Sequence, residues 1–132
     1  MVLFAQYEPI AGAPLALLDA VFLSLHLPEA PISIIGYGMP RVGNQDFANF
    51  VNARFPVKRI NNQKDPVPTV PGESLGYVHT SGEVHIIESG AFESCPGPDN
   101  TNLLCTAGDV PNIFAGRLAD HDGPYNGVTM GC

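Results

Sequence analysis

The run Ile32 to Gly38 constrains the fold more than any other part of this chain. It reads ISIIGYG, a continuous apolar stretch rich in β-branched residues and without polar alternation. Such a run is typical of a strand that is covered on both faces in a parallel sheet. Stretches with helical spacing of apolar residues lie before and after it. This alternation of strand and helix implies right-handed crossovers and predicts an α/β fold with a mostly parallel sheet and flanking helices.

The helix before this strand is expected to begin near Pro14, because proline is common at the first helical position, and to end near Leu27. Its opposite side is also poor in charge, so we expect both sides to contact protein. The positions that recur at helical spacing and are expected to face inward are Leu15, Leu18, Val21, Phe22 and Leu25.

Further elements follow from similar signals. The chain begins with MVLFAQY, which is readable as a short strand. Asn44 can cap a helix whose Phe47, Phe50 and Val51 turn inward, and FPVKRIN reads as the next strand. The stretch GYVHTSGEVHIIES predicts an antiparallel hairpin or two late strands around Ser81–Gly82.

The cysteines sit late in the chain, at Cys95, Cys105 and Cys132. The first two bracket a loop rich in turn residues, CPGPDNTNLLC, and we expect a disulfide to close this C-terminal loop and to contribute about 3 kcal/mol of stability. Free thiols or a partial metal site are the alternatives, and no C-x-x-C spacing supports a metal. A disulfide favours an oxidising compartment. The sequence gives no role for Cys132.

Length and charge exclude several classes of protein. The 132 residues fit one domain, and the net charge of -7 with only six Lys and Arg argues against a nucleic-acid partner. The apolar stretch Leu15 to Leu27 is too short, and too interrupted by Asp19 and His26, to cross a bilayer. No Lys or Arg precedes it, so it does not resemble a signal peptide either.

Residues Gly72 to Gly76 spell G-x-S-x-G, the pattern of an activated serine. That motif works only as a strained turn between a strand and a helix. Here a proline-rich loop precedes Ser74 and a β-like stretch follows it, so we interpret Ser74 as an ordinary loop residue. The spacing of Gly36, Gly38 and Gly43 is not a dinucleotide fingerprint, and no cofactor is predicted.

Five segments together resemble the C-terminal half of a fungal class 3 lipase, of the triacylglycerol lipase and feruloyl esterase type. They are APLALLDAVFLSLHL, ISIIGYGMPRVGNQDFANFVN, RINNQKDPVPTVP, GYVHTSGEVHI and ADHDGPY. The resemblance runs from about Gly12 onward. It implies a partial α/β-hydrolase fold, with residues 1–132 as a single, truncated lipase domain and residues 1–11 as a divergent N-terminal segment.

The resemblance also implies site residues. Asp65 would be the triad acid and His121 the triad base. Laying the family's G-H-S-L-G-type elbow on this chain puts Ile10 at the serine position and Ala11 at the backbone oxyanion position. Without the resemblance, Asp65 could simply cap a turn, and His121 could be a solvated tail residue or part of an acidic metal cluster. The two other histidines after the proline-rich loop, His79 and His85, are interpreted as structural or exposed.

By resemblance the chain is a secreted carboxylic-ester hydrolase acting on a lipid or related ester, without a metal. Because isoleucine offers no attacking oxygen, we expect this chain to be inactive. The alternative is a non-catalytic fragment or pseudoenzyme that binds a partner or an acyl ligand. No signal peptide is predicted, and the sequence leaves open whether Met1 is the true start. A parallel sheet lacking its earlier strands would expose an edge, which predicts self-association.

Overall fold

The computed structural model describes residues 2–4 and 9–130. Its sheet follows the order β1-β2-β3-β4-β5, in which the first four strands run parallel and the last is antiparallel. This confirms the predicted α/β class with a mostly parallel sheet. The strands are β1 (Val2–Phe4), β2 (Ser33–Tyr37), β3 (Val57–Asn62), β4 (Glu83–Ile86) and β5 (Phe92–Cys95).

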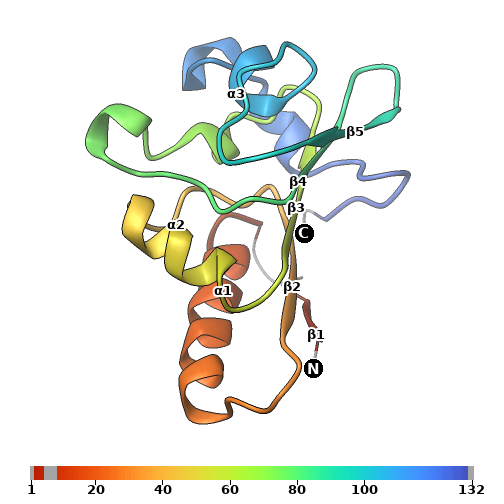
Figure 1. Cartoon of the computed structure of the whole chain (residues 1–132). Helices are drawn as coiled ribbons and strands as arrows, with labels where there is room; N and C mark the ends of the chain where they lie inside the picture. Colours follow the sequence, from red (N-terminus) through yellow and green to blue (C-terminus); the bar gives the residue numbers. More distant parts are fainter. Residues whose placement is uncertain (1, 5–8, 131–132) are drawn as a thin grey trace.

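The two longest helices, α1 (Pro9–His26) and α2 (Gln45–Asn52), lie side by side on one face of the sheet (Figure 1). The short helix α3 (Thr106–Asp109) follows the disulfide loop. Several 3-10 turns complete the described part of the chain: η1 (Val67–Thr69), η2 (Glu73–Leu75), η3 (Ile113–Ala115) and η4 (Leu118–His121). None of the described helices is long and apolar enough to span a membrane.

Helix α1 differs from the prediction in its start and in its inward face. It begins at Pro9, so Pro14 lies inside it rather than at its first position. The buried positions are Ala13, Leu17 and Ala20. The small alanine side chains let the helix approach the sheet closely. The side of α1 that faces the core is therefore the side with the smaller residues, not the side with the most hydrophobic ones.

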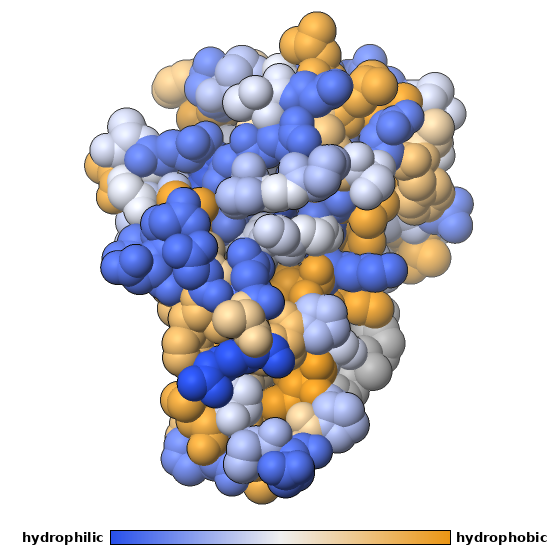
Figure 2. All heavy atoms as spheres, in the orientation of Figure 1, coloured by the Kyte–Doolittle hydropathy of each residue, from blue (hydrophilic) through white to orange (hydrophobic). Residues whose placement is uncertain are grey.

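The larger apolar side chains of α1 point outward, which corrects the predicted inward face. We call them the α1 stripe: Leu15, Leu18, Phe22 and Leu25, which are 45% to 59% exposed. Only Val21 of the predicted set packs against the core, where it is partly buried. Figure 2 shows hydrophobic residues gathered over the lower part of the molecule, where Figure 1 places α1.

The main core lies between α1, α2 and the sheet. Its fully buried members include Leu17, Ile34 and Val51. As predicted, Asn44 caps α2, since its side-chain oxygen accepts a hydrogen bond from the Phe47 N–H at 3.0 Å. Phe47 and Phe50 are partly buried against the same core.

The predicted hairpin around Ser81–Gly82 is wrong. Instead, β4 pairs parallel with β3, and the hairpin joins β4 to β5 through a turn closed by the Ile87 N–H and the Ala91 carbonyl at 3.0 Å. Gly82 has φ +100°, and a Cβ there would lie 1.9 Å from the Val57 carbonyl oxygen. The glycine therefore serves a close approach to β3 rather than a hairpin turn.

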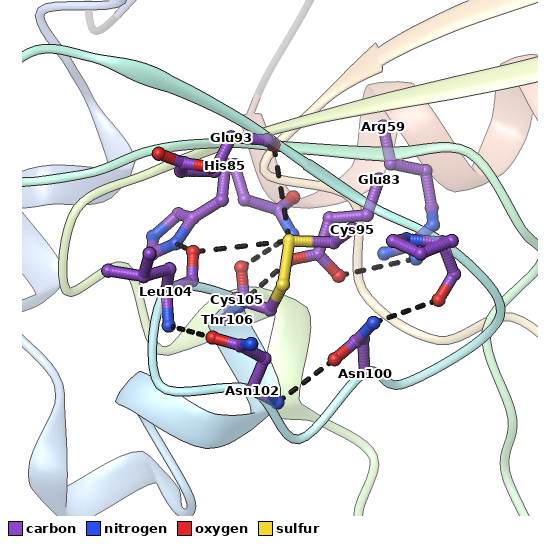
Figure 3. The surroundings of a disulfide bond; sticks show 12 residues. Arg59, Glu83, His85, Glu93, Cys95, Asn100, Asn102, Leu104, Cys105 and Thr106 are labelled. Atoms are coloured by element: carbon purple, nitrogen blue, oxygen red, sulfur yellow. Dashed lines mark hydrogen bonds and ion pairs between the residues drawn. A yellow bond between two sulfur atoms is a disulfide. The ribbon is translucent and has the colours of Figure 1, made fainter.

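The predicted disulfide between Cys95 and Cys105 is confirmed. Figure 3 shows it beside polar side chains that include Arg59, Glu83 and Thr106, which are buried. The Glu83 carboxylate accepts the Thr106 N–H at 2.8 Å and pairs with the fully buried Arg59 guanidinium at 3.5 Å. These bonds attach the residues after the disulfide loop to β3 and β4.

Candidate active site

Asp65 lies just beyond the carboxyl end of β3, in a turn closed by its own N–H and the Asn62 carbonyl at 2.9 Å. Its side chain is fully buried. One carboxylate oxygen, Oδ1, accepts the Val67 N–H at 2.8 Å. The other, Oδ2, is directed at His121. The turn-capping interpretation of Asp65 is thus satisfied by one oxygen, and the second remains for a separate partner.

His121 ends the 3-10 turn η4 and is 3% exposed. Its Nδ1 lies 2.8 Å from Asp65 Oδ2, across 56 residues of sequence. When the Asp65 carboxylate is ionised it can only accept, so Nδ1 then donates to it, and in the neutral imidazole Nε2 keeps its lone pair. Nε2 is buried and has no hydrogen-bond partner among the described residues. The alternative of a solvated tail histidine is therefore wrong.

Two further residues enclose this pair. The Tyr125 hydroxyl donates to the His121 carbonyl at 3.1 Å. Burial first, and then the negative charge of Asp65, raises the pKa of Tyr125 far above its usual range. Gly38, at φ +54°, covers the pair so closely that a Cβ there would lie 2.7 Å from the imidazole and 2.8 Å from Asp65 Oδ2. A side chain at residue 38 would therefore displace the pair.

Asp120 links the segment that carries His121 to the segment that carries Asp65. Its Oδ2 accepts the Lys64 N–H at 3.0 Å and the Arg117 Nε–H at 2.9 Å. Its backbone carbonyl accepts the Asn62 side-chain amide at 2.9 Å. The sequence alone indicates no role for Asp120, Asn62, Gly38 or Tyr125. The contacts of the first three join residues far apart in the chain, and the contact of Tyr125 depends on the turn after His121. The one local signal was the position of Asp120 and Tyr125 within ADHDGPY.

The first turn of α1 lies at the same edge of the sheet. In a parallel βαβ unit, the helix begins at the carboxyl end of its strand, as do Gly38 after β2 and Asp65 after β3. Residue 10 belongs to this turn, but its side chain lies outside the described residues. Ala11 is exposed there, in the turn whose N–H groups have no intrahelical acceptor. Cys132 also lies outside the described residues.

The remaining candidates do not join this site. Ser74 is exposed in the 3-10 turn η2. His79 and His85 are buried and structural: the His79 ring donates to the Pro68 carbonyl, and the His85 ring nitrogens lie 2.8 Å from the carbonyls of Leu104 and Gln63. Within the described residues, the one close group of potential metal ligands is Glu83 with Cys95 and Cys105. Its sulfurs are bonded to each other, so they offer no thiolate to a metal.

Comparison with known proteins shows which family this chain resembles. Residues 11–75 match the model for "Lipase (class 3)". The secreted mono- and diacylglycerol lipase MDL2 of Malassezia globosa is 35% identical over 124 residues, covering 91% of this chain and 39% of that protein. Secreted mono- and diacylglycerol lipase 1 of Fusarium solani is 34% identical over 90 residues, covering 61% of this chain and 26% of that protein.

Solved structures of lipases have the same fold as this chain. The lipase of Rhizomucor miehei, in its propeptide complex, superposes with a TM-score of 0.84 at 26% identity, covering 99% of this chain and 42% of that one. The lipase of Rhizopus microsporus var. chinensis gives a TM-score of 0.76 at 27% identity, covering 95% of this chain and 43% of that one. This chain therefore spans well under half the length of the relatives it matches.

Proposed function

Because this chain belongs to the class 3 lipase family, we propose that Asp65 and His121 are the acid and base of a serine-dependent ester hydrolase. The proposal rests on the 2.8 Å bond from His121 Nδ1 to Asp65 Oδ2, with Nε2 buried and without a hydrogen-bond partner in the part of the chain that the structure describes. A buried ring nitrogen without a partner costs stability, and a catalytic role would explain why the chain tolerates that cost.

In ester hydrolysis by acyl transfer, the Nε2 lone pair takes the proton of an attacking hydroxyl and later returns it to the leaving alcohol. The Asp65 carboxylate holds the imidazole in the required tautomer and stabilises its positive form. The Val67 N–H fixes the second oxygen of that carboxylate. The Tyr125 hydroxyl anchors the backbone of His121 from the other side.

The nucleophile is the element that this chain does not supply at the expected place. Residue 10, where the family's serine aligns, is isoleucine, which has no ionisable or nucleophilic atom. The Ala11 N–H would serve as one oxyanion donor. Loss of a triad serine in another hydrolase costs about a million-fold in turnover, so we propose that this chain does not hydrolyse esters.

Turnover of p-nitrophenyl butyrate by the purified chain tests this. We expect the rate to equal that of an inert protein, and Asp65→Asn and His121→Ala to leave it unchanged. A rate that survives purification and disappears in both variants would overturn the assignment of inactivity and show that another hydroxyl serves as nucleophile.

The names of the relatives support the proposed substrate class and location. Those proteins are named secreted mono- and diacylglycerol lipases, so the acid–base pair fits a site for a lipid or related ester. An extracellular location is supported by the same names and by the Cys95–Cys105 disulfide, since disulfides persist in oxidising compartments.

A non-catalytic binding role is the second candidate, supported by a hollow of about 340 Å³ on the sheet face away from α1 and α2. Apolar side chains form most of its lining, among them Tyr37, Ile60, Ile86, Phe92, Val128 and Met130. Titration with a fluorescent fatty acid separates the candidates. Saturable binding that Ile60→Glu abolishes would support the binding role, and the absence of binding would remove it.

A further inference from the structure

The segment after Asp65 poses a hydrogen-bonding problem. Residues 65–71 read DPVPTVP, and their three prolines have no N–H. The 3-10 turn η1 uses the carbonyls of Pro66 and Val67, which accept the N–H groups of Thr69 and Val70 at 3.0 and 3.1 Å. The next four carbonyls, of residues 68–71, point out of this turn. Buried carbonyls require donors, and this segment cannot provide them itself.

Arg41 supplies most of those donors. It lies in the loop after β2, and its side chain is only 4% exposed. Its backbone N–H donates to the Val70 carbonyl at 2.9 Å. Its guanidinium Nη1 donates to the carbonyls of Thr69 and, at 2.9 Å, Pro71. One residue thus holds three successive carbonyls of the segment that begins at Asp65.

The guanidinium is neutralised by a residue from the disulfide loop. Asp99 Oδ1 accepts from Arg41 Nε at 2.9 Å and from Nη2 at 2.7 Å. The other oxygen of Asp99 accepts the His79 N–H at 2.9 Å. The Asp99 side chain is 8% exposed, so this is a largely buried ion pair. The Glu73 carboxylate also lies 3.3 Å from Arg41 Nη2, but it is 58% exposed, so Asp99 is the closer and more buried of the two acids.

His79 supplies the remaining donor. Burial, followed by the charge of Arg59, holds the pKa of His79 well below its usual range, so its ring is neutral at physiological pH. Its Nε2–H therefore donates to the Pro68 carbonyl at 2.7 Å. All four carbonyls of residues 68–71 are accounted for by Arg41 and His79.

We propose that Arg41 is the positioning residue for Asp65, and that Asp99 in the disulfide loop keeps the Arg41 guanidinium in place. The effect passes through the segment that Arg41 holds, whose Val67 N–H binds one oxygen of Asp65 and so directs the other toward His121. The proposal rests on the role proposed above for Asp65. Lysine cannot replace Arg41, because a single ammonium cannot reproduce a forked donor set.

The test is the hydrogen bond itself, measured in the whole chain labelled uniformly with ¹⁵N. The His121 Nδ1–H proton gives a low-field resonance while it is bonded to Asp65. In Arg41→Met and in Arg41→Lys we expect that resonance to disappear, or its exchange with water to accelerate about tenfold or more, the effect of losing one charged hydrogen bond. The amide spectrum of α2 reports whether each variant is folded.

Asp99→Asn is the milder variant, and it tests the proposal if Arg41→Met does not fold. It keeps the shape and removes the charge, and we expect the same exchange to accelerate by a smaller factor. Arg54→Met is the matched control, because Arg54 is an exposed cation over the Phe50 ring and touches none of these residues. An unchanged His121 Nδ1–H exchange in folded Arg41→Met or in Asp99→Asn, or an equal change in Arg54→Met, would overturn the proposal. Absence of the resonance from the unmodified chain would instead contradict the Asp65–His121 pair.

Discussion

The two ends of the sheet differ in whether polar or apolar side chains are buried. At the end formed by β3, β4 and β5, charged and polar side chains are buried and paired, as in Arg59 with Glu83 and Arg41 with Asp99. At the β1 end, the α1 stripe leaves large apolar side chains about half exposed. The Asp65–His121 pair belongs to the first end. Its geometry is therefore set by contacts within the described residues, whereas the α1 end has apolar surface available for a partner.

The largest effect expected from this comparison lies on α1 itself. Leu17 is 2% exposed and faces the sheet, whereas Leu18 next to it is 45% exposed in the stripe. Leu17→Ala leaves a cavity in the core and is expected to lower the free energy of unfolding by about 2–5 kcal/mol. Leu18→Ala is expected to change it by about 0.5 kcal/mol or less. Urea denaturation of both variants measures the difference, and equal losses would contradict the assigned orientation of α1.

The second effect concerns the opposite end. Replacing Cys95 and Cys105 together by serine opens a loop with a sequence separation of 10 residues. We expect the free energy of unfolding to fall by about 3 kcal/mol, chiefly through the larger entropy of the unfolded chain. Denaturation of the unmodified chain with and without reductant gives an independent comparison. An unchanged midpoint in both experiments would show that the buried polar contacts hold this end without the disulfide.

The third effect tests the partner surface. The sequence predicts self-association through an exposed sheet edge, and β1 is the edge strand next to α1 among the described strands. The α1 stripe adds apolar area there, worth about 1.5–3 kcal/mol for each large side chain that becomes buried. If the chain associates, Phe22→Glu is expected to weaken the association constant tenfold or more, an effect of about 1.4 kcal/mol. Sedimentation over a concentration series measures this constant, with Phe114→Glu as a control at the other end. Equal weakening by both variants would place the association elsewhere.

The smallest effect is a pH dependence at the polar end. The pKa of His79 is lowered by burial from the usual 6.5, so the folded state binds fewer protons there than the unfolded state does. Its stabilisation is complete above pH 6.5 and is lost as the pH falls. His79→Gln is expected to lose less stability than the unmodified chain between about pH 7.5 and about pH 5. Parallel pH profiles of the unfolding free energy would contradict the burial of a neutral ring.

The sequence predicted the elements whose signals are local. Ile32 to Gly38 has the composition of a strand, Asn44 has a cap position, and the paired cysteines bracket a loop; the strand, the cap and the disulfide are confirmed. The strand is fully buried on one face only, because alternate residues of β2 are partly exposed. The inward face of α1 was predicted wrongly, because alanines at 13 and 20 allow a close approach that hydrophobic periodicity does not reveal. Ser81–Gly82 resembled a hairpin turn, but that glycine is required by the nearby Val57 carbonyl.

The candidate site was predicted only in part. Asp65 and His121 were identified through a resemblance, and the structure brings them within hydrogen-bond distance. The residues that hold them in place could not be predicted. Asp120 reaches the Lys64 N–H 56 residues away and Arg41 reaches Asp99 58 residues away, and no local pattern encodes such contacts. Gly38 was considered only for a nucleotide loop, because its packing against the imidazole depends on the fold.

The central claim is that this chain holds an acid–base pair without an attacking oxygen beside it. Incubation with a fluorophosphonate, followed by intact-mass analysis, tests the claim most directly, with Ile10→Ser measured alongside the unmodified chain. We expect no covalent adduct on the unmodified chain and a single adduct at residue 10 in the variant, lost again when His121→Ala is added. A stoichiometric adduct on any hydroxyl of the unmodified chain that His121→Ala abolishes would contradict it.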